Sequence, residues 1–117
     1  MDAKQAALEE KLAEILKQAA DVASQLQAIE QGPGTPHYDQ IEIPAHEVGQ
    51  RLSRMVQANR TGDVAARQCL ECDCPDCGQS CQVEVSKREV HSMDGLVELI
   101  ETVAHCHRCR RSFFPSA

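Results

Sequence analysis

Two pairs of cysteines offer the clearest chemistry in this 117-residue chain. They occur in Cys74-Pro-Asp-Cys77-Gly and in Cys106-His-Arg-Cys109, and 28 residues separate them. The C-x-x-C spacing lets two thiolates bind one ion from a single tight turn, and a second such turn completes a tetrahedral shell. The sequence therefore predicts a closed, structural Zn²⁺ site formed by Cys74, Cys77, Cys106 and Cys109.

Three further cysteines leave alternatives open at this site. Cys69-Leu-Glu-Cys72 is itself a C-x-x-C pair, and Cys81 follows the first predicted pair by four residues. Cys69 and Cys72 could replace that pair as ligands, or could form a second site with Cys81 and His91. The spacing alone does not decide between these arrangements.

The residues around the cysteine pairs allow two other roles. His105 and His107 flank Cys106, and either could replace a cysteine in a Cys₃His shell, although we expect them to be solvated or to support the ligands. Cys-Pro-Asp-Cys resembles an oxidoreductase motif in isolation, but the sequence offers no βαβ context or helix N-terminus to lower the pKa of a thiol. A structural metal site is therefore the favoured interpretation.

The segment between the two pairs has the pattern of a β-hairpin. Gln82-Val-Glu-Val-Ser and Leu96-Val-Glu-Leu-Ile-Glu-Thr-Val are rich in β-branched residues, and Met93-Asp94-Gly95 between them contains an Asp-Gly turn signal. Such a hairpin carries the chain away from the first pair and returns it to the second. We expect a zinc ribbon over residues 69–117.

The first 31 residues have a helical pattern with one apolar seam. Apolar residues follow one another at alternating spacings of four and three: Leu8, Leu12, Ile15, Ala19, Val22, Leu26 and Ile29. Gly32-Pro33-Gly34 then ends the pattern, so the helix should end near Gln31. The seam is consistent with an intramolecular helical hairpin and with a parallel or antiparallel coiled-coil homodimer through residues 8–29.

Residues 32–45 are expected to form an extended linker, and residues 46–68 a second helix with its connector. Pro44 suits the first turn of that helix, which should end near Thr61-Gly62-Asp63. One side of the second helix would carry Val48, Leu52, Met55 and Val56. The predicted fold class is α+β: an N-terminal helical hairpin or coiled coil, followed by a small β-hairpin zinc ribbon.

Composition limits the classes of protein to which the chain could belong. Seven cysteines, an N-terminus without an apolar signal segment and the absence of a membrane-length apolar run favour a cytoplasmic protein over a secreted or membrane protein. The formal charge of −6 opposes nucleic-acid binding, which would need a local basic patch. Candidate phosphate contacts are Lys87, Arg88, Arg108, Arg110 and Arg111.

The stretch from Cys74 to Pro115 resembles the N-terminal zinc-ribbon region of the ISKra-type bacterial insertion-sequence transposases. The shared features, in order, are a Cys-Pro-x-Cys-Gly turn, a hairpin containing Gly95, a second C-x-x-C and an aromatic-Pro ending at Phe114-Pro115. A weaker likeness extends back to Tyr38-Asp-Gln-Ile-Glu and Val48-Gly-Gln-Arg-Leu. The strand before the second pair departs from the family, which often has Arg and aromatic residues there.

The resemblance implies a non-catalytic, DNA-binding portion of a transposase-like protein, with a zinc ribbon that helps to bind element ends and to assemble the complex. Because that family carries its catalytic acidic residues in a later RNase H-like domain, we expect no enzymatic activity and assign no catalytic residue. The alternatives are a protein-interaction adaptor with a zinc ribbon and a coiled coil, and a decayed transposase remnant.

Overall fold

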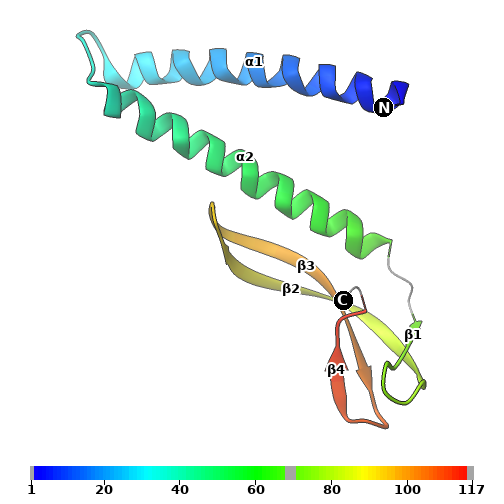
Figure 1. Ribbon diagram of the computed structural model, residues 1–117. Helices are drawn as coiled ribbons and strands as arrows, with labels where there is room; N and C mark the ends of the chain where they lie inside the picture. Colours follow the sequence, from blue (N-terminus) through cyan, green and yellow to red (C-terminus); the bar gives the residue numbers. More distant parts are fainter. Residues whose placement is uncertain (1, 68–70, 116–117) are drawn as a thin grey trace. The chain divides into compact units, whose positions relative to one another are not determined.

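The computed structural model describes residues 2–67 and 71–115. Two helices, α1 (Ala3–Gln31) and α2 (Tyr38–Ala66), precede four strands (Figure 1). The strands are β1 (Glu71–Asp73), β2 (Ser80–Ser92), β3 (Gly95–Cys106) and β4 (Arg111–Phe113). The chain divides into two compact units, residues 1–49 and 50–117, and α2 begins in the first and ends in the second. The predicted α+β class is confirmed.

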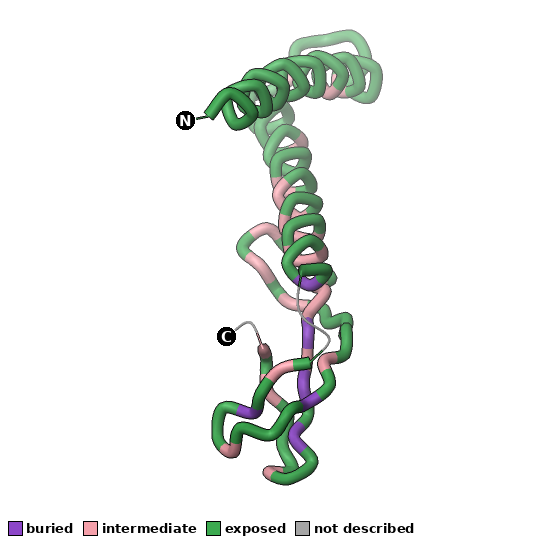
Figure 2. The backbone as a smooth tube through the Cα atoms, turned by 90° about the vertical axis from the view of Figure 1, so that its right-hand side faces the viewer, coloured by how far each residue is buried: buried purple, intermediate pink, exposed green. Residues whose placement is uncertain are grey.

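Helix α1 forms as the heptad pattern predicts. The Asp2 side chain caps its start by accepting a hydrogen bond of 2.6 Å from the Gln5 N–H. The helix ends at Gln31, where Gly32 takes a φ of +68° and its N–H donates to the carbonyl oxygen of Ala28. None of the residues in α1 is buried, so its apolar seam lies on the surface (Figure 2).

Helix α2 begins at Tyr38, well before the expected start at residue 46, and it contains Pro44 in its interior. Pro44 has no N–H to offer the carbonyl four residues earlier, that of Gln40. The side-chain amide of Gln31 donates to this carbonyl instead, at 2.9 Å, and that of Gln27 donates to the carbonyl of Ile41 at 3.2 Å. The expected linker is therefore shortened to residues 32–37, because α1 supplies hydrogen bonds to the turn that Pro44 disturbs.

The four strands form one antiparallel sheet in the order β1-β2-β3-β4. The long hairpin of β2 and β3 pairs Val83 with Ala104 at one end and Ser92 with Gly95 at the other. Met93 and Asp94 form its two-residue turn, and Gly95 takes a φ of +109°, which side-chain-bearing residues rarely adopt. The predicted hairpin is confirmed, and its two-residue turn begins one residue before the Asp-Gly pair that predicted it.

The second half of α2 holds the turn of this hairpin. Ser53 Oγ donates a 2.5 Å hydrogen bond to Asp94 Oδ2, and Arg54 Nη1 donates one of 2.7 Å to the Asp94 carbonyl. The helix also continues beyond its expected end near residues 61–63, and Ala65 in its last turn is buried. Contacts with the hairpin thus outweigh the low helix propensity of Gly62.

Cysteines make up most of the buried core of the sheet. The buried cluster consists of Cys74, Cys81, Ala104 and Cys106, and the half-buried residues packed against it are Cys72, Cys77, Val83, Cys109 and Phe113. Val97 is the one large aliphatic side chain that is buried among the described residues. A core this small contributes little hydrophobic free energy, so the sheet depends on another source of stability.

Candidate metal centre

The turn between β1 and β2 presents the first pair of thiols. The Cys74 N–H donates to the Gln79 carbonyl at 2.8 Å, and the Gly78 N–H donates back to the Cys74 carbonyl at 2.9 Å. Gly78 takes a φ of +75°, which lets the chain reverse sharply after Cys77. The side chains of Cys74 and Cys77 are thereby held on one side of a tight turn.

A second turn, between β3 and β4, presents the other pair. Cys106 ends β3 opposite Arg111 of β4, and the Cys109 N–H donates to Cys106 Sγ at 3.4 Å. Among the described residues other than glycine, only Arg110 has a positive φ, of 56°. This left-handed residue turns the chain into β4 directly after Cys109.

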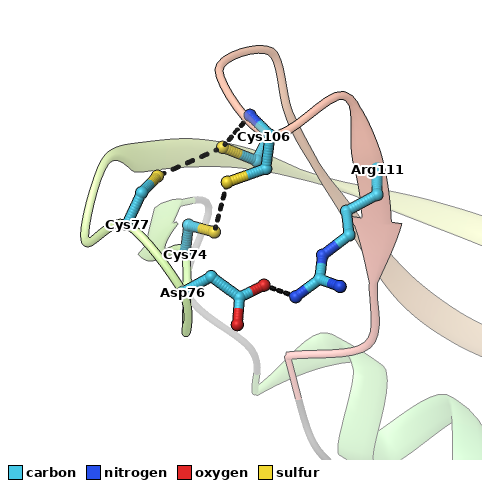
Figure 3. A network of polar contacts seen from close by, with 6 residues as sticks. Cys74, Asp76, Cys77, Cys106 and Arg111 are labelled. Carbon is cyan, nitrogen blue, oxygen red and sulfur yellow. Dashed lines mark hydrogen bonds and ion pairs between the residues drawn. The ribbon is translucent and has the colours of Figure 1, made fainter.

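The two turns bring four thiols together (Figure 3). The Sγ atoms of Cys74 and Cys109 lie 3.8 Å apart, those of Cys77 and Cys106 lie 3.5 Å apart, and all four lie within 4.8 Å of one another. Tetrahedral Zn–S bonds of about 2.3 Å require sulfur–sulfur separations of about 3.8 Å. The predicted cysteines therefore form a set that could hold one metal ion, and an all-thiolate set is typical of structural zinc.

The thiols of this set influence one another electrostatically. The backbone N–H of Cys109 is the main cause that lowers the pKa of Cys106 to about 6, with hydrogen bonds from Cys77 and Cys74 adding to it. The pKa of Cys109 is raised to about 12, chiefly by its hydrogen bond with Cys77 and by burial. The metal-free set thus carries a thiolate at Cys106 and a protonated thiol at Cys109 at neutral pH.

Cys81 lies beside the set as a fifth thiol, a position that the sequence did not reveal. Its Sγ donates to the Gln79 carbonyl at 3.3 Å. Burial is the main cause that raises its pKa to about 11, and its hydrogen bond with Cys106 raises it further. Cys81 is therefore a neutral thiol in the metal-free protein. The alternation of β2, which points Cys81 and Val83 to the same face, was the available signal.

The structure also locates most of the alternative ligands that the sequence left open. Cys69 lies outside the described residues. Cys72 lies in β1, opposite Cys81. A site combining Cys81 with His91 is wrong, because the two residues occupy opposite ends of β2 and ten strand residues span about 33 Å.

The two histidines near the second pair lie outside the four-thiol set. His105 and His107 are exposed, and their ring centroids lie 5.0 Å apart. His105 Nδ1 lies 3.1 Å from Ser112 Oγ. Neither histidine joins the metal-binding set found among the described residues.

Three of the five predicted phosphate-binding residues make ion pairs within the chain. Lys87 Nζ lies 3.7 Å from Glu98, Arg88 lies 2.5 Å from Glu101, and Arg111 pairs with Asp76 (Figure 3). Arg108 and Arg110 have no ion pair in the described part of the chain.

The five basic residues also do not lie on one face of the sheet. Lys87 and Arg88 are consecutive in β2, and consecutive strand residues point to opposite faces. Their side chains therefore cannot both join one basic surface. Arg108 and Arg110 flank Cys109 on the second turn.

In residues 2–67 and 71–115, neither helix combines the length and the apolarity that crossing a bilayer requires. Comparisons with protein-family models, curated proteins and solved structures found no match to this chain.

Proposed function

We propose that this chain is a non-catalytic, zinc-bound assembly module of a transposase-like protein, in which α1 pairs two copies. The all-cysteine donor set supports zinc as the ion, because four thiolates leave no open position for water or substrate. The likeness of residues 74–115 to ISKra-type transposases supports the link to transposition.

The exposed seam of α1 is the observation that carries the pairing. Leu12 is 54% exposed, Val22 65% and Ile29 79%, and the other large seam residues are similarly uncovered. Covering a half-exposed Leu, Ile or Val side chain contributes about 1 kcal/mol. Because the seam repeats every seven residues, a second copy of the same helix presents the complementary surface.

Charges beside the seam fit a second copy of the chain. Lys4 and Lys11 precede core positions of the heptad, whereas Glu9 and Glu30 follow core positions. In a parallel pair, Lys4 faces Glu9 of the partner subunit, since such contacts join residues five apart. The two symmetric contacts favour this arrangement over one that brings like charges together.

Sedimentation equilibrium of the full chain tests the pairing. We expect a dimer for the wild type, and a monomer for the variant that combines Ile15→Gln with Val22→Gln in the seam. Lys17→Gln, on the opposite side of α1, is the matched control and should remain dimeric. A wild type that stays monomeric at all concentrations, or a seam variant that dimerises as well as the control, would refute the pairing.

A second candidate function, binding of DNA ends, is supported by Arg108 and Arg110. Both flank Cys109 on the metal-binding turn, and neither is neutralised by an ion pair among the described residues. They would contact phosphates rather than bases. Fluorescence anisotropy with duplex DNA should show weaker binding when both are replaced by Gln, whereas Arg88→Gln, at an ion-paired position, should have little effect. Equal losses would refute this assignment.

A further inference from the structure

Helix α2 carries an apolar face that lies uncovered in the described part of the chain. Its large side chains are all at least 42% exposed, and they are Tyr38, Ile41, Val48, Leu52, Met55 and Val56. From Tyr38 to Met55 the apolar residues, with Ala45 among them, follow one another at alternating spacings of three and four, the heptad spacing that also marks the seam of α1. We call these residues the α2 face. A contiguous apolar surface of this size is rare on a monomer and marks an interaction site.

The β2–β3 hairpin packs against the other side of α2. Ser53 and Arg54 bind Asp94 in the turn of the hairpin. At 3.6 residues per turn, Arg54 lies about 160° around the helix axis from both Leu52 and Val56. The hairpin therefore leaves the α2 face open.

The apolar stripes of both helices are wider than a two-stranded coiled coil needs. A two-stranded seam uses two core positions in each heptad, with charged residues beside them. The residues that directly follow two core positions of α1 are Leu16 and Ala23, and Val56 follows a core position of α2. Three apolar positions in a heptad are typical of helices that pack in bundles. The middle parts of both helices thus have the pattern of a core with more than two helices.

We propose that the α2 face packs against the paired α1 helices of two copies of the chain, so that the dimer has a core of four helices. This inference rests on the proposed pairing of α1 and names the second surface that the pairing buries. The seam of α1 spans about three heptads, which is short for a stable two-stranded coil. The α2 face adds six large apolar side chains per chain to that interface. A second copy is the fitting occupant, because its helices carry apolar surfaces with the same heptad spacing.

The fluorescence of Tyr38 tests whether the α2 face becomes covered. The chain has one Tyr and no Trp, and Tyr38 is 72% exposed in the single chain. Acrylamide should therefore quench the fluorescence efficiently at low protein concentration. The quenching constant should fall in parallel with the dimer fraction measured by sedimentation equilibrium. The seam variant with Ile15→Gln and Val22→Gln should stay fully quenchable at every concentration.

Two isoleucines in α2 provide a matched pair of variants. Ile41 belongs to the α2 face and is 42% exposed, whereas Ile43 is 57% exposed and lies about 160° around the helix axis from it. Both side chains are too exposed for their replacement to unfold the chain. Ile41→Gln removes two apolar side chains from the dimer core and should raise the dissociation constant of the dimer at least about tenfold. Ile43→Gln should leave this constant close to that of the wild type.

The outcomes separate this inference from the pairing on which it rests. If Tyr38 stays equally quenchable while the dimer forms, or if Ile41→Gln and Ile43→Gln have equal dissociation constants, the four-helix core is overturned and the pairing of α1 stands. Weak quenching of the monomer would show that α1 of the same chain covers the α2 face, which also overturns the inference. A wild type that stays monomeric at all concentrations overturns both proposals.

Discussion

Removal of the metal should unfold the four-stranded sheet and leave α1 helical. The sheet buries one large aliphatic side chain among its described residues, Val97, and burial of a valine contributes about 2 kcal/mol. A structural zinc ion contributes an apparent binding free energy of about 10–16 kcal/mol. This exceeds or equals the whole unfolding free energy of a typical domain, so the ribbon should not persist without its ion.

Helix α1 should stay folded when the sheet unfolds. Its cap at Asp2 and its end at Gly32 are local, and the contacts that join it to α2 come from Gln27 and Gln31. Neither the ends of α1 nor its contacts with α2 involve the cysteine cluster. The change in the far-ultraviolet circular dichroism signal on metal removal should therefore come mainly from the strands and the second half of α2.

The assay is heteronuclear NMR of the full chain before and after addition of a strong chelator. Amide signals of β2 and β3 should collapse to random-coil positions, while those of α1 stay in place. Cys109→Ser, which removes one metal ligand, should show the same unfolded sheet without chelator. Cys72→Ser keeps all four predicted metal ligands and should retain the folded sheet. Dispersed β2 and β3 signals in the chelated protein would refute the reasoning, because burial would then suffice to hold the sheet.

Two further predictions concern protons and the helical hairpin. Zinc affinity should fall at least about tenfold for each pH unit below 7.5, because Cys109 must lose its proton to bind, and the fall should steepen as the pH passes below about 6, where Cys106 also becomes protonated. Competition with a chromophoric chelator measures this, and a pH-independent affinity would contradict it. Gln31→Ala should destabilise the first turns of α2 by about 0.5–1 kcal/mol in hydrogen exchange. The same change in a Pro44→Ala background should cost nothing, since the helix then supplies its own donor; an equal cost there would argue against the role of Pro44.

The features that the sequence predicted are those that short-range geometry determines. Each C-x-x-C turn fixes its own two thiols, and the turn at Met93-Asp94, which leads into Gly95, fixes the hairpin that brings the two C-x-x-C turns together. The end of α1 at Gly32 likewise depends on a local conformation. These parts of the fold and of the metal set therefore agree with the structure.

The start of α2 could not be predicted, because it depends on residues far along the chain. Pro44 argues for a helix start when only its neighbours are considered. The amides of Gln27 and Gln31 reach across from α1 and satisfy carbonyls that precede Pro44, which lets the helix begin at Tyr38. A pattern read along one segment does not contain that contact.

The strand register is the second feature that could not be predicted from the sequence. The sequence gives the two strands of the hairpin but not which residue opposes which. Only the register brings Lys87 diagonally across from Glu98, where they form an ion pair, and places Cys72 opposite Cys81. Because of this register, the basic surface is smaller than predicted and the thiol cluster is larger than predicted.

The two proposed activities, pairing and DNA binding, depend on each other through charge. In the proposed complex with DNA, Arg108 and Arg110 would neutralise two phosphates per chain. The logarithm of the affinity would then fall against the logarithm of the salt concentration with a slope of about −2. A dimer presents two such turns, so its slope should be about −4 on DNA long enough to meet both, and linked binding raises affinity by about 10²–10⁴. The chain carries a formal charge of −6, so a monomer has little other attraction for DNA. The seam variant with Ile15→Gln and Val22→Gln should therefore lose both affinity and half of the salt slope, although it leaves both arginines unchanged. Equal slopes for the variant and the wild type would show that pairing and DNA binding are independent.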